Sequence, residues 1–169
     1  MKIRRLVQVA MFAALTAVLT LISIPTPWGI PITLQTFAVS LCGYMLGAWQ
    51  GLAAIGVYIA IGAVGLPVFS GLRGGVQVLT GATGGYIFGF LFLALLCGLG
   101  AKRKIYISLP LGFAGLAICH LLGTLQFGYL TGRNFPEAFL VASAPYLIKD
   151  AASIVLSYFL ALKLRRFMK

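Results

Sequence analysis

Acidic side chains are almost absent from this chain of 169 residues, which holds only two aspartate and glutamate residues together and one histidine. Hydrolytic chemistry needs a base and an orienting acid beside its nucleophile, and a metal site needs several ligands close together. Because so few groups cannot build either arrangement, we expect no enzyme, no metal site and no cofactor. The phosphate-binding motif Gly-x-x-x-x-Gly-Lys-[Ser/Thr] is also missing, so the chain itself is not expected to hydrolyse ATP.

Cysteine is scarce as well, and the three cysteines, Cys42, Cys97 and Cys119, all lie within apolar runs. Metal and redox sites place cysteines at close spacing, and no two of these have it. We therefore expect all three to be packing residues in the interior.

Charged residues make up only 9% of the chain, whereas hydrophobic residues make up 61%. This mixture is too apolar for a soluble domain of this size and predicts an integral membrane protein in a lipid bilayer. The net charge is +11, but the basic residues occur singly or in short clusters between apolar runs. Since they form no continuous basic face, no nucleic-acid partner is expected.

Long apolar stretches make up most of the sequence. Hydrocarbon about 30 Å thick is crossed by roughly 20 helical residues, so these stretches predict an all-α fold with six transmembrane helices in one domain covering residues 1–169. The expected spans are roughly 6–24, 33–49, 51–66, 81–101, 105–131 and 139–163. The first imitates a signal peptide but is expected to stay uncleaved, and the second and third could also form one bent hairpin.

Basic residues are unevenly distributed between the two sides of this arrangement. With six spans and the amino end inside, the cytoplasmic side receives residues 2–5, 102–104 and 163–169, which hold ten of the thirteen lysines and arginines. The outer side receives Arg73 and Arg133. Because lysine and arginine prefer cytoplasmic loops, an even number of spans and cytoplasmic termini are predicted.

Three segments on the outer side, 25–35, 66–86 and 131–139, are rich in glycine, proline and polar residues. Unpaired peptide groups are costly in hydrocarbon, so we expect these segments to fold over one another as a cap. Trp28 and Gln35 lie in or beside the first of them, whose prolines favour a stiff, preformed lid. Trp28 equally fits the aromatic belt at a membrane surface.

A charged pair, Lys149 and Asp150, interrupts the last apolar stretch in the sequence SAPYLIKDAAS. A charge near the centre of a membrane helix costs roughly 2.5–3.5 kcal/mol, so it usually faces a polar cavity or another charge. Adjacent helical residues point about 100° apart, which disfavours mutual pairing and indicates different partners. A ligand site is therefore favoured over a structural ion pair.

Glycine is concentrated in GLRGGVQVLTGATGGYIFGF, residues 71–90. Clustered glycines can expose backbone amides at the start of the following helix, and helix packing explains them equally well. Arg73 and Gln77 in the same block would suit a carboxylate, although Arg73 could instead meet lipid phosphate. The one histidine, His120, lies in an apolar span and is expected to be packed or singly hydrogen-bonded.

Small residues recur at helical spacing in the first span, at Ala10, Ala13, Ala14 and Ala17. Such spacing lets helices approach closely in lipid. A helix of the same chain and a helix of another subunit both fit as the partner.

Three blocks, PITLQTF, GLRGGVQVLTGATGGYIFGF and APYLIKD, in this order, resemble the BioY family, the biotin-binding S components of energy-coupling factor transporters. The resemblance covers essentially the whole chain. It implies a six-helix S-component fold in the plasma membrane of a prokaryote, high-affinity capture of biotin, and assembly with a membrane-embedded T subunit and two ATPase subunits. It also implies that the alanines of the first span contact the T subunit.

Biotin carries a carboxylate, a ureido ring with two N–H groups, and an apolar thiophane and alkyl body. On this resemblance Asp150 would accept from the ureido N–H groups, and Lys149 or Arg73 would meet the carboxylate. Further contacts are expected from Gln77, Thr83, Gly84, Gly85, Tyr86, Trp28 and Gln35. An S component for riboflavin or thiamine and a ligand-free membrane scaffold remain the alternatives.

Overall fold

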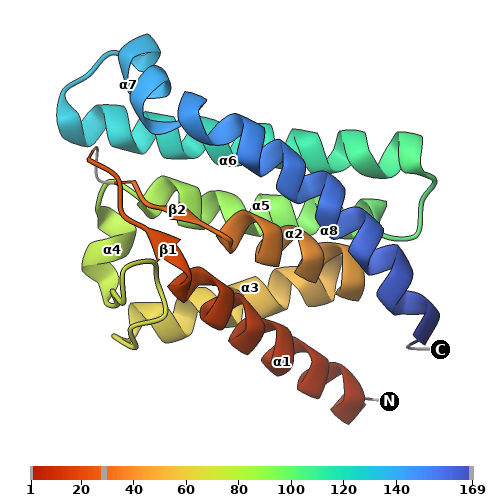
Figure 1. Ribbon diagram of the computed structural model, residues 1–169. Coiled ribbons are helices and arrows are strands. Elements are labelled where there is room, and N and C mark those ends of the chain that lie inside the picture. The colour runs from red at the N-terminus through yellow and green to blue at the C-terminus, as the bar shows by residue number, and fades with distance from the viewer. Residues whose placement is uncertain (1, 28–29, 168–169) are drawn as a thin grey trace.

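A computed structural model describes residues 2–27 and 30–167, so Trp28 lies outside the described residues. The main elements are long helices whose axes are roughly aligned with one another (Figure 1). They are α1 (Lys2–Leu21), α2 (Gln35–Leu46), α3 (Ala48–Ala63), α5 (Gly84–Gly100), α6 (Ile105–Thr131) and α8 (Leu147–Phe167). The short elements are β1 (Ser23–Ile24), β2 (Ile32–Thr33), α4 (Val76–Thr80), α7 (Phe135–Ala142) and the 3₁₀ turn η1 (Ala144–Tyr146). Apart from the two-residue strands, the all-α prediction is confirmed.

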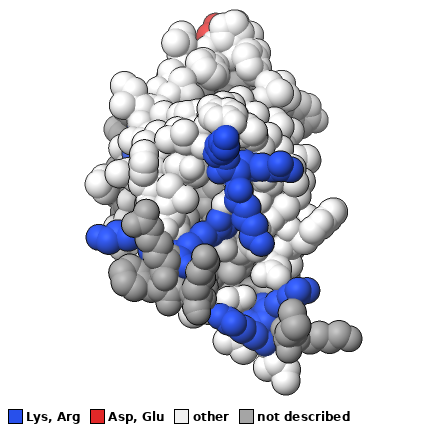
Figure 2. Space-filling model, turned by 90° about the vertical axis from the view of Figure 1, so that its right-hand side faces the viewer, with Lys and Arg blue, Asp and Glu red and all other residues white. Residues whose placement is uncertain are grey.

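Successive long helices alternate in direction, so the chain begins and ends at the same end of the molecule (Figure 1). Figure 2 shows that lysine and arginine side chains gather there. This basic end is formed by the start of α1, the α5–α6 loop and the end of α8, with Arg4, Arg5, Lys102, Arg103, Lys104, Lys163 and Arg165. The β1–β2 hairpin, α4 and α7 lie at the opposite end, which we call the hairpin end.

Three stretches within the described residues are long and apolar enough to cross a membrane: 3–21, 105–131 and 135–165. Helices α3 and α5 are apolar but shorter. Between α2 and α3 stands Gly47 alone, with a φ of 85° that glycine adopts without strain. The chain reverses at this residue, so α2 and α3 are antiparallel helices that form a hairpin.

The span predicted over residues 139–163 lies within the apolar stretch 135–165, but this stretch is not one regular helix. Helix α7 ends at Ala142, η1 follows, and α8 begins only at Leu147. Pro145 lacks an N–H group and its ring clashes with the preceding turn, which favours a break in the helix here. The break places Lys149 and Asp150 in the first turn of α8, at the hairpin end, rather than within a continuous span.

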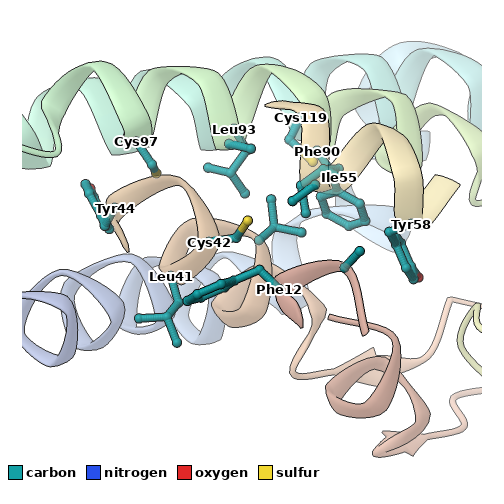
Figure 3. Close-up of a cluster of buried hydrophobic side chains, with 14 of the residues drawn as sticks. Phe12, Leu41, Cys42, Tyr44, Ile55, Tyr58, Phe90, Leu93, Cys97 and Cys119 are labelled. Atoms are coloured by element: carbon teal, nitrogen blue, oxygen red, sulfur yellow. The ribbon is translucent and has the colours of Figure 1, made fainter. Parts of the chain in front are cut away.

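Large apolar side chains from α1, α2, α3, α5 and α6 meet in one buried cluster (Figure 3). Phe12, Leu41, Ile55 and Leu93 are among its members. The three cysteines are unpaired and buried, as the sequence predicts. Burial of this apolar surface against other helices holds the bundle together around the cavity described below.

Helices α5 and α6 approach so closely that side chains would not fit between them. A Cβ atom added to Gly89 would lie 2.6 Å from Cα of Cys119, and one added to Gly85 would lie 2.9 Å from Cα of Gly123. Real Cβ contacts are not this short. The glycines of α5 therefore fix its spacing from α6, and both helices contribute to the wall of the cavity.

Candidate functional site

A cavity opens at the hairpin end, between the β1–β2 hairpin, α2, α5, α6 and α8. About 620 Å³ of space is free of atoms there, its open mouth included. Its apolar wall comes mainly from Ile30, Phe69, Val78, Ile87, Phe90 and Leu116. Its polar groups come mainly from Gln35, Thr36, Thr83, His120, Lys149 and Asp150. A mostly apolar hollow with a few polar groups is typical of a small-molecule site.

Asp150 is the most deeply placed charge of this wall, with 5% of the residue exposed. Its Oδ2 lies 3.2 Å from Nε2 of His120 on α6. Its Oδ1 forms an ion pair with Nζ of Lys149. The hydroxyl of Thr36 on α2 lies near the same carboxylate. Side chains from three helices therefore meet at one buried carboxylate. Removing a negative charge from water is costly, and these partners offset that cost.

Lys149 and Asp150 contact each other, although their spacing was expected to disfavour mutual pairing, and each also has a partner of its own, as expected. The flexible four-carbon stem of lysine lets the ammonium reach back to the neighbouring carboxylate, although the Cβ atoms diverge. Lys149 has a second partner as well: Nζ donates to the carbonyl oxygen of Thr33 at 2.9 Å. The ammonium thus joins α8 to the hairpin above the cavity.

Thr26 and Ile30 are tied to η1, directly before α8, by further bonds. The hydroxyl of Tyr146 donates to the carbonyl oxygen of Ile30, and Thr26 donates to the same oxygen at 2.6 Å. Ile30 also packs against Tyr146 and α7 in a small buried cluster. Ile30 of the first outer segment and Tyr146 therefore meet at the wall of the cavity, with α7 beside them.

Three more of the predicted site residues line the cavity: Gln35, Thr83 and Tyr86. The Gln35 amide donates to the hydroxyl of Tyr58 at 2.8 Å. The hydroxyl of Tyr86 donates to the carbonyl oxygen of Ala142 at 2.7 Å and lies 2.8 Å from the Ser143 hydroxyl. Tyr86 thus presents its ring to the cavity, while its hydroxyl joins α5 to the end of α7.

Arg73 lies beside the cavity rather than in it. Its side chain is exposed, and Nε donates to the carbonyl oxygen of Ser70 at 3.1 Å. It lines a neighbouring hollow that shares Pro31 and Ser70 with the cavity. A ligand that passes between those two residues would reach the guanidinium.

Gln77, Gly84 and Gly85 are not brought to the cavity wall. Gln77 is exposed and donates to the carbonyl oxygen of Gly74 at 2.7 Å. Gly84 and Gly85 are buried against Leu79 and α6, where a Cβ atom would collide with backbone. Helix packing accounts for these two glycines, and their amides as ligand donors remain a prediction.

The alanines of α1 divide between two faces. Ala13 is 2% exposed and belongs to the core, with Ala17 packed partly against it. Ala10 and Ala14 are exposed. Only these last two are open to a helix outside the chain.

His120 and Thr36 lie in the site but were not among the predicted site residues, although His120 is packed and has a single polar partner among the described residues, as the sequence predicts. Both are buried, with 4% and 6% exposed, and both lie beside Asp150. His120 had a usable signal, because a lone histidine in an apolar span needs a polar partner and the chain offers only two acids. Thr36 had none, since threonine is common in membrane helices.

An all-helical, multi-pass bundle with a mostly apolar cavity at one end has the architecture of a substrate-binding membrane component. The sequence model of the BioY family matches residues 1–169. The chain belongs to the BioY family, as its sequence motifs predict.

Two curated relatives match nearly the full length. The chain is 39% identical over 165 residues to "Biotin transporter BioY" of Thermotoga maritima, with 96% of each protein covered. It is 34% identical over 165 residues to "Probable biotin transporter BioY" of Pyrococcus horikoshii, with 98% of each covered. Among solved structures it matches the S-component for biotin from an ECF-type ABC transporter with a TM-score of 0.88 at 23% identity, covering 98% of this chain and 92% of that one. This likeness confirms the S-component fold.

Proposed function

We propose that this chain is the high-affinity biotin-binding subunit of an ATP-driven vitamin uptake transporter. The observation that carries the proposal is the buried carboxylate of Asp150 in the wall of an apolar cavity, held by groups from α2, α6 and α8. Named relatives are biotin transporters, which favours biotin over riboflavin or thiamine. The names of relatives also speak against a ligand-free scaffold.

The ureido ring and the apolar body of biotin match this cavity chemically. A ureido N–H is a donor, and a carboxylate oxygen such as that of Asp150 is a strong acceptor for it. The thiophane ring and alkyl chain suit the apolar wall formed by Ile87, Phe90 and Leu116. The ureido ring therefore pairs with a hydrogen-bond acceptor, and the rest of the ligand packs against apolar side chains.

The carboxylate of biotin would extend past Pro31 and Ser70 toward Arg73. Lys149 is already engaged with Asp150 and the Thr33 carbonyl oxygen, whereas Arg73 makes one backbone bond and has further N–H groups exposed. A guanidinium binds a carboxylate through paired N–H groups. Arg73 is therefore assigned the carboxylate, and Lys149 is assigned the positioning of Asp150 and the hairpin.

The membrane placement follows from charge. Because the basic end carries most of the lysine and arginine, it would face the cytoplasm of a prokaryotic plasma membrane, with both termini inside and the cavity opening outward. A membrane-embedded T subunit would contact Ala10 and Ala14 on the exposed face of α1. Two ATPase subunits would supply the energy, since the chain lacks a phosphate-binding loop.

Thermal unfolding of the detergent-purified protein tests the ligand. A ligand that binds only the folded state stabilises it by RT ln(1 + [L]/Kd), about 4 kcal/mol at a thousandfold excess over Kd. Biotin is expected to raise the unfolding temperature, and riboflavin and thiamine are expected to leave it unchanged. Equal shifts with all three vitamins, or none with biotin, would refute the assignment.

A further inference from the structure

His120 takes no part in the ligand contacts assigned so far, yet it lies in the wall of the cavity with 4% of the residue exposed. It comes from the middle of α6 and reaches Asp150 across the site, with Nε2 3.2 Å from Oδ2. The ring also meets Tyr86 edge to face, with centroids 5.8 Å apart and planes at 87°. These contacts hold the imidazole in one orientation.

The contact with Asp150 fixes where the ring carries its proton. An ionised carboxylate oxygen can only accept, so Nε2 must be the N–H donor. Lys149 already brings one positive charge to this carboxylate. A neutral imidazole therefore leaves the cluster of three side chains without net charge. In a neutral ring with its proton on Nε2, the other nitrogen, Nδ1, is an acceptor.

Nδ1 of His120 is buried and has no hydrogen-bond partner among the residues that the structure describes. Buried polar atoms almost always have one. Tyr86 cannot supply it, because its hydroxyl is engaged with Ala142 and Ser143. The Asp150 oxygen Oδ1 contacts the Lys149 ammonium, and a carboxylate oxygen can accept a second hydrogen bond.

His120 thus has an unused acceptor atom next to a carboxylate that can accept a further hydrogen bond. A cyclic urea carries two N–H groups that point away from each other, so no single acceptor atom serves both. We propose that Nδ1 of His120 accepts a hydrogen bond from one ureido N–H of the ligand while Asp150 accepts from the other. This assignment rests on the proposed function, and it makes His120 a residue that determines specificity for the ureido ring.

The chain contains a single histidine, so its ring nitrogens can be observed without ambiguity in protein labelled with ¹⁵N-histidine. In the ligand-free protein, NMR is expected to find Nε2 protonated and Nδ1 unprotonated and free of hydrogen bonds. On addition of biotin, the Nδ1 resonance is expected to move upfield, as an accepting nitrogen does. A doubly protonated ring, or an Nδ1 resonance that biotin does not move, would overturn the proposal. So would an Nδ1 already hydrogen-bonded without biotin, which would indicate a bound water.

A second measurement uses two analogues of biotin in which an oxygen atom replaces one or the other ureido N–H without added bulk. The wild-type protein should bind each analogue at least roughly tenfold more weakly than biotin, because an acceptor is left unpaired. His120→Gln keeps a donor for Asp150 but removes the acceptor at Nδ1, whereas His120→Asn keeps a polar group near the Nδ1 position. In His120→Gln, discrimination against one analogue should disappear and discrimination against the other should persist.

The outcomes separate this inference from the proposed function. If the wild-type protein binds biotin, and His120→Gln discriminates against both analogues as the wild type does, His120 only positions Asp150 and the inference fails alone. If the wild-type protein does not bind biotin, the proposed function fails with it. The NMR experiment needs no variant, so it decides the question even where a substitution prevents folding.

Discussion

Nζ of Lys149 donates to the carbonyl oxygen of Thr33, a residue 116 positions earlier in the chain, while it also contacts the carboxylate of Asp150. One ammonium group therefore joins the buried acid of the site to the hairpin that covers it.

Replacing Lys149 by methionine keeps most of the side-chain volume but removes both contacts. Asp150 then keeps His120 and Thr36 as partners, so binding should weaken by roughly 10- to 100-fold rather than vanish. The loss should lie mainly in faster dissociation, because the hairpin is less firmly held. Binding kinetics would be compared with Lys163→Met, the same change at the exposed basic end. Equal effects of both substitutions would contradict this role.

The assignment of the ligand carboxylate to Arg73 predicts a charge-specific effect. Arg73→Gln should weaken binding of biotin roughly tenfold or more, and should leave binding of biotin amide, which has no negative charge, nearly unchanged. Titration calorimetry with both ligands measures the ratio, and Arg133→Gln serves as the exposed control on the same side of the molecule. If Arg73→Gln weakens both ligands equally, the carboxylate is bound elsewhere.

The close approach of α5 and α6 predicts opposite effects for two glycine-to-alanine changes. Gly89→Ala would place a Cβ atom 2.6 Å from Cα of Cys119 and should destabilise the fold by about 1–3 kcal/mol. Gly56→Ala, in α3, meets nothing within 4 Å and should be neutral or stabilise by up to about 1 kcal/mol through helix propensity. Thermal unfolding in detergent measures both. A stable Gly89→Ala variant would show that the two helices can separate.

The proposed orientation is tested by labelling single cysteines in intact cells. Arg133→Cys, in the α6–α7 loop at the hairpin end, should react with a membrane-impermeant maleimide. Arg103→Cys, in the α5–α6 loop at the basic end, should react only after the cells are opened. Both positions are exposed, and the three native cysteines are buried and give little background. The reverse pattern would overturn the orientation.

Much of the fold follows from apolar length and charge distribution, because both are properties of the linear chain. The stretch predicted over 105–131 coincides with α6, and the basic residues predicted to share one side do gather at one end. The break before α8 was missed although Pro145 signals it, because the surrounding residues are apolar enough to continue a span. The short helix α4 carries too few residues for a helical pattern to be recognised.

The site was less predictable, because it depends on which side chains meet in space. Asp150 was predicted to be a site residue because an acid in an apolar run is costly and usually faces a polar cavity or another charge. The pairing of Asp150 with Lys149 was misjudged, since backbone spacing says little about where a long, flexible side chain ends. Glycine content alone could not tell Gly85, which is packed against α6, from a glycine that faces a ligand.

The most direct test of this account is titration calorimetry of biotin with Asp150→Asn beside Glu137→Gln. These two substitutions each neutralise one of the only two acidic side chains in the chain, the first buried in the cavity wall and the second exposed on α7. Asp150→Asn is expected to lose at least roughly tenfold in affinity, because a charged acceptor for the ureido group is removed. Glu137→Gln is expected to bind as the wild type does. Unchanged affinity in a folded Asp150→Asn protein would contradict the central claim.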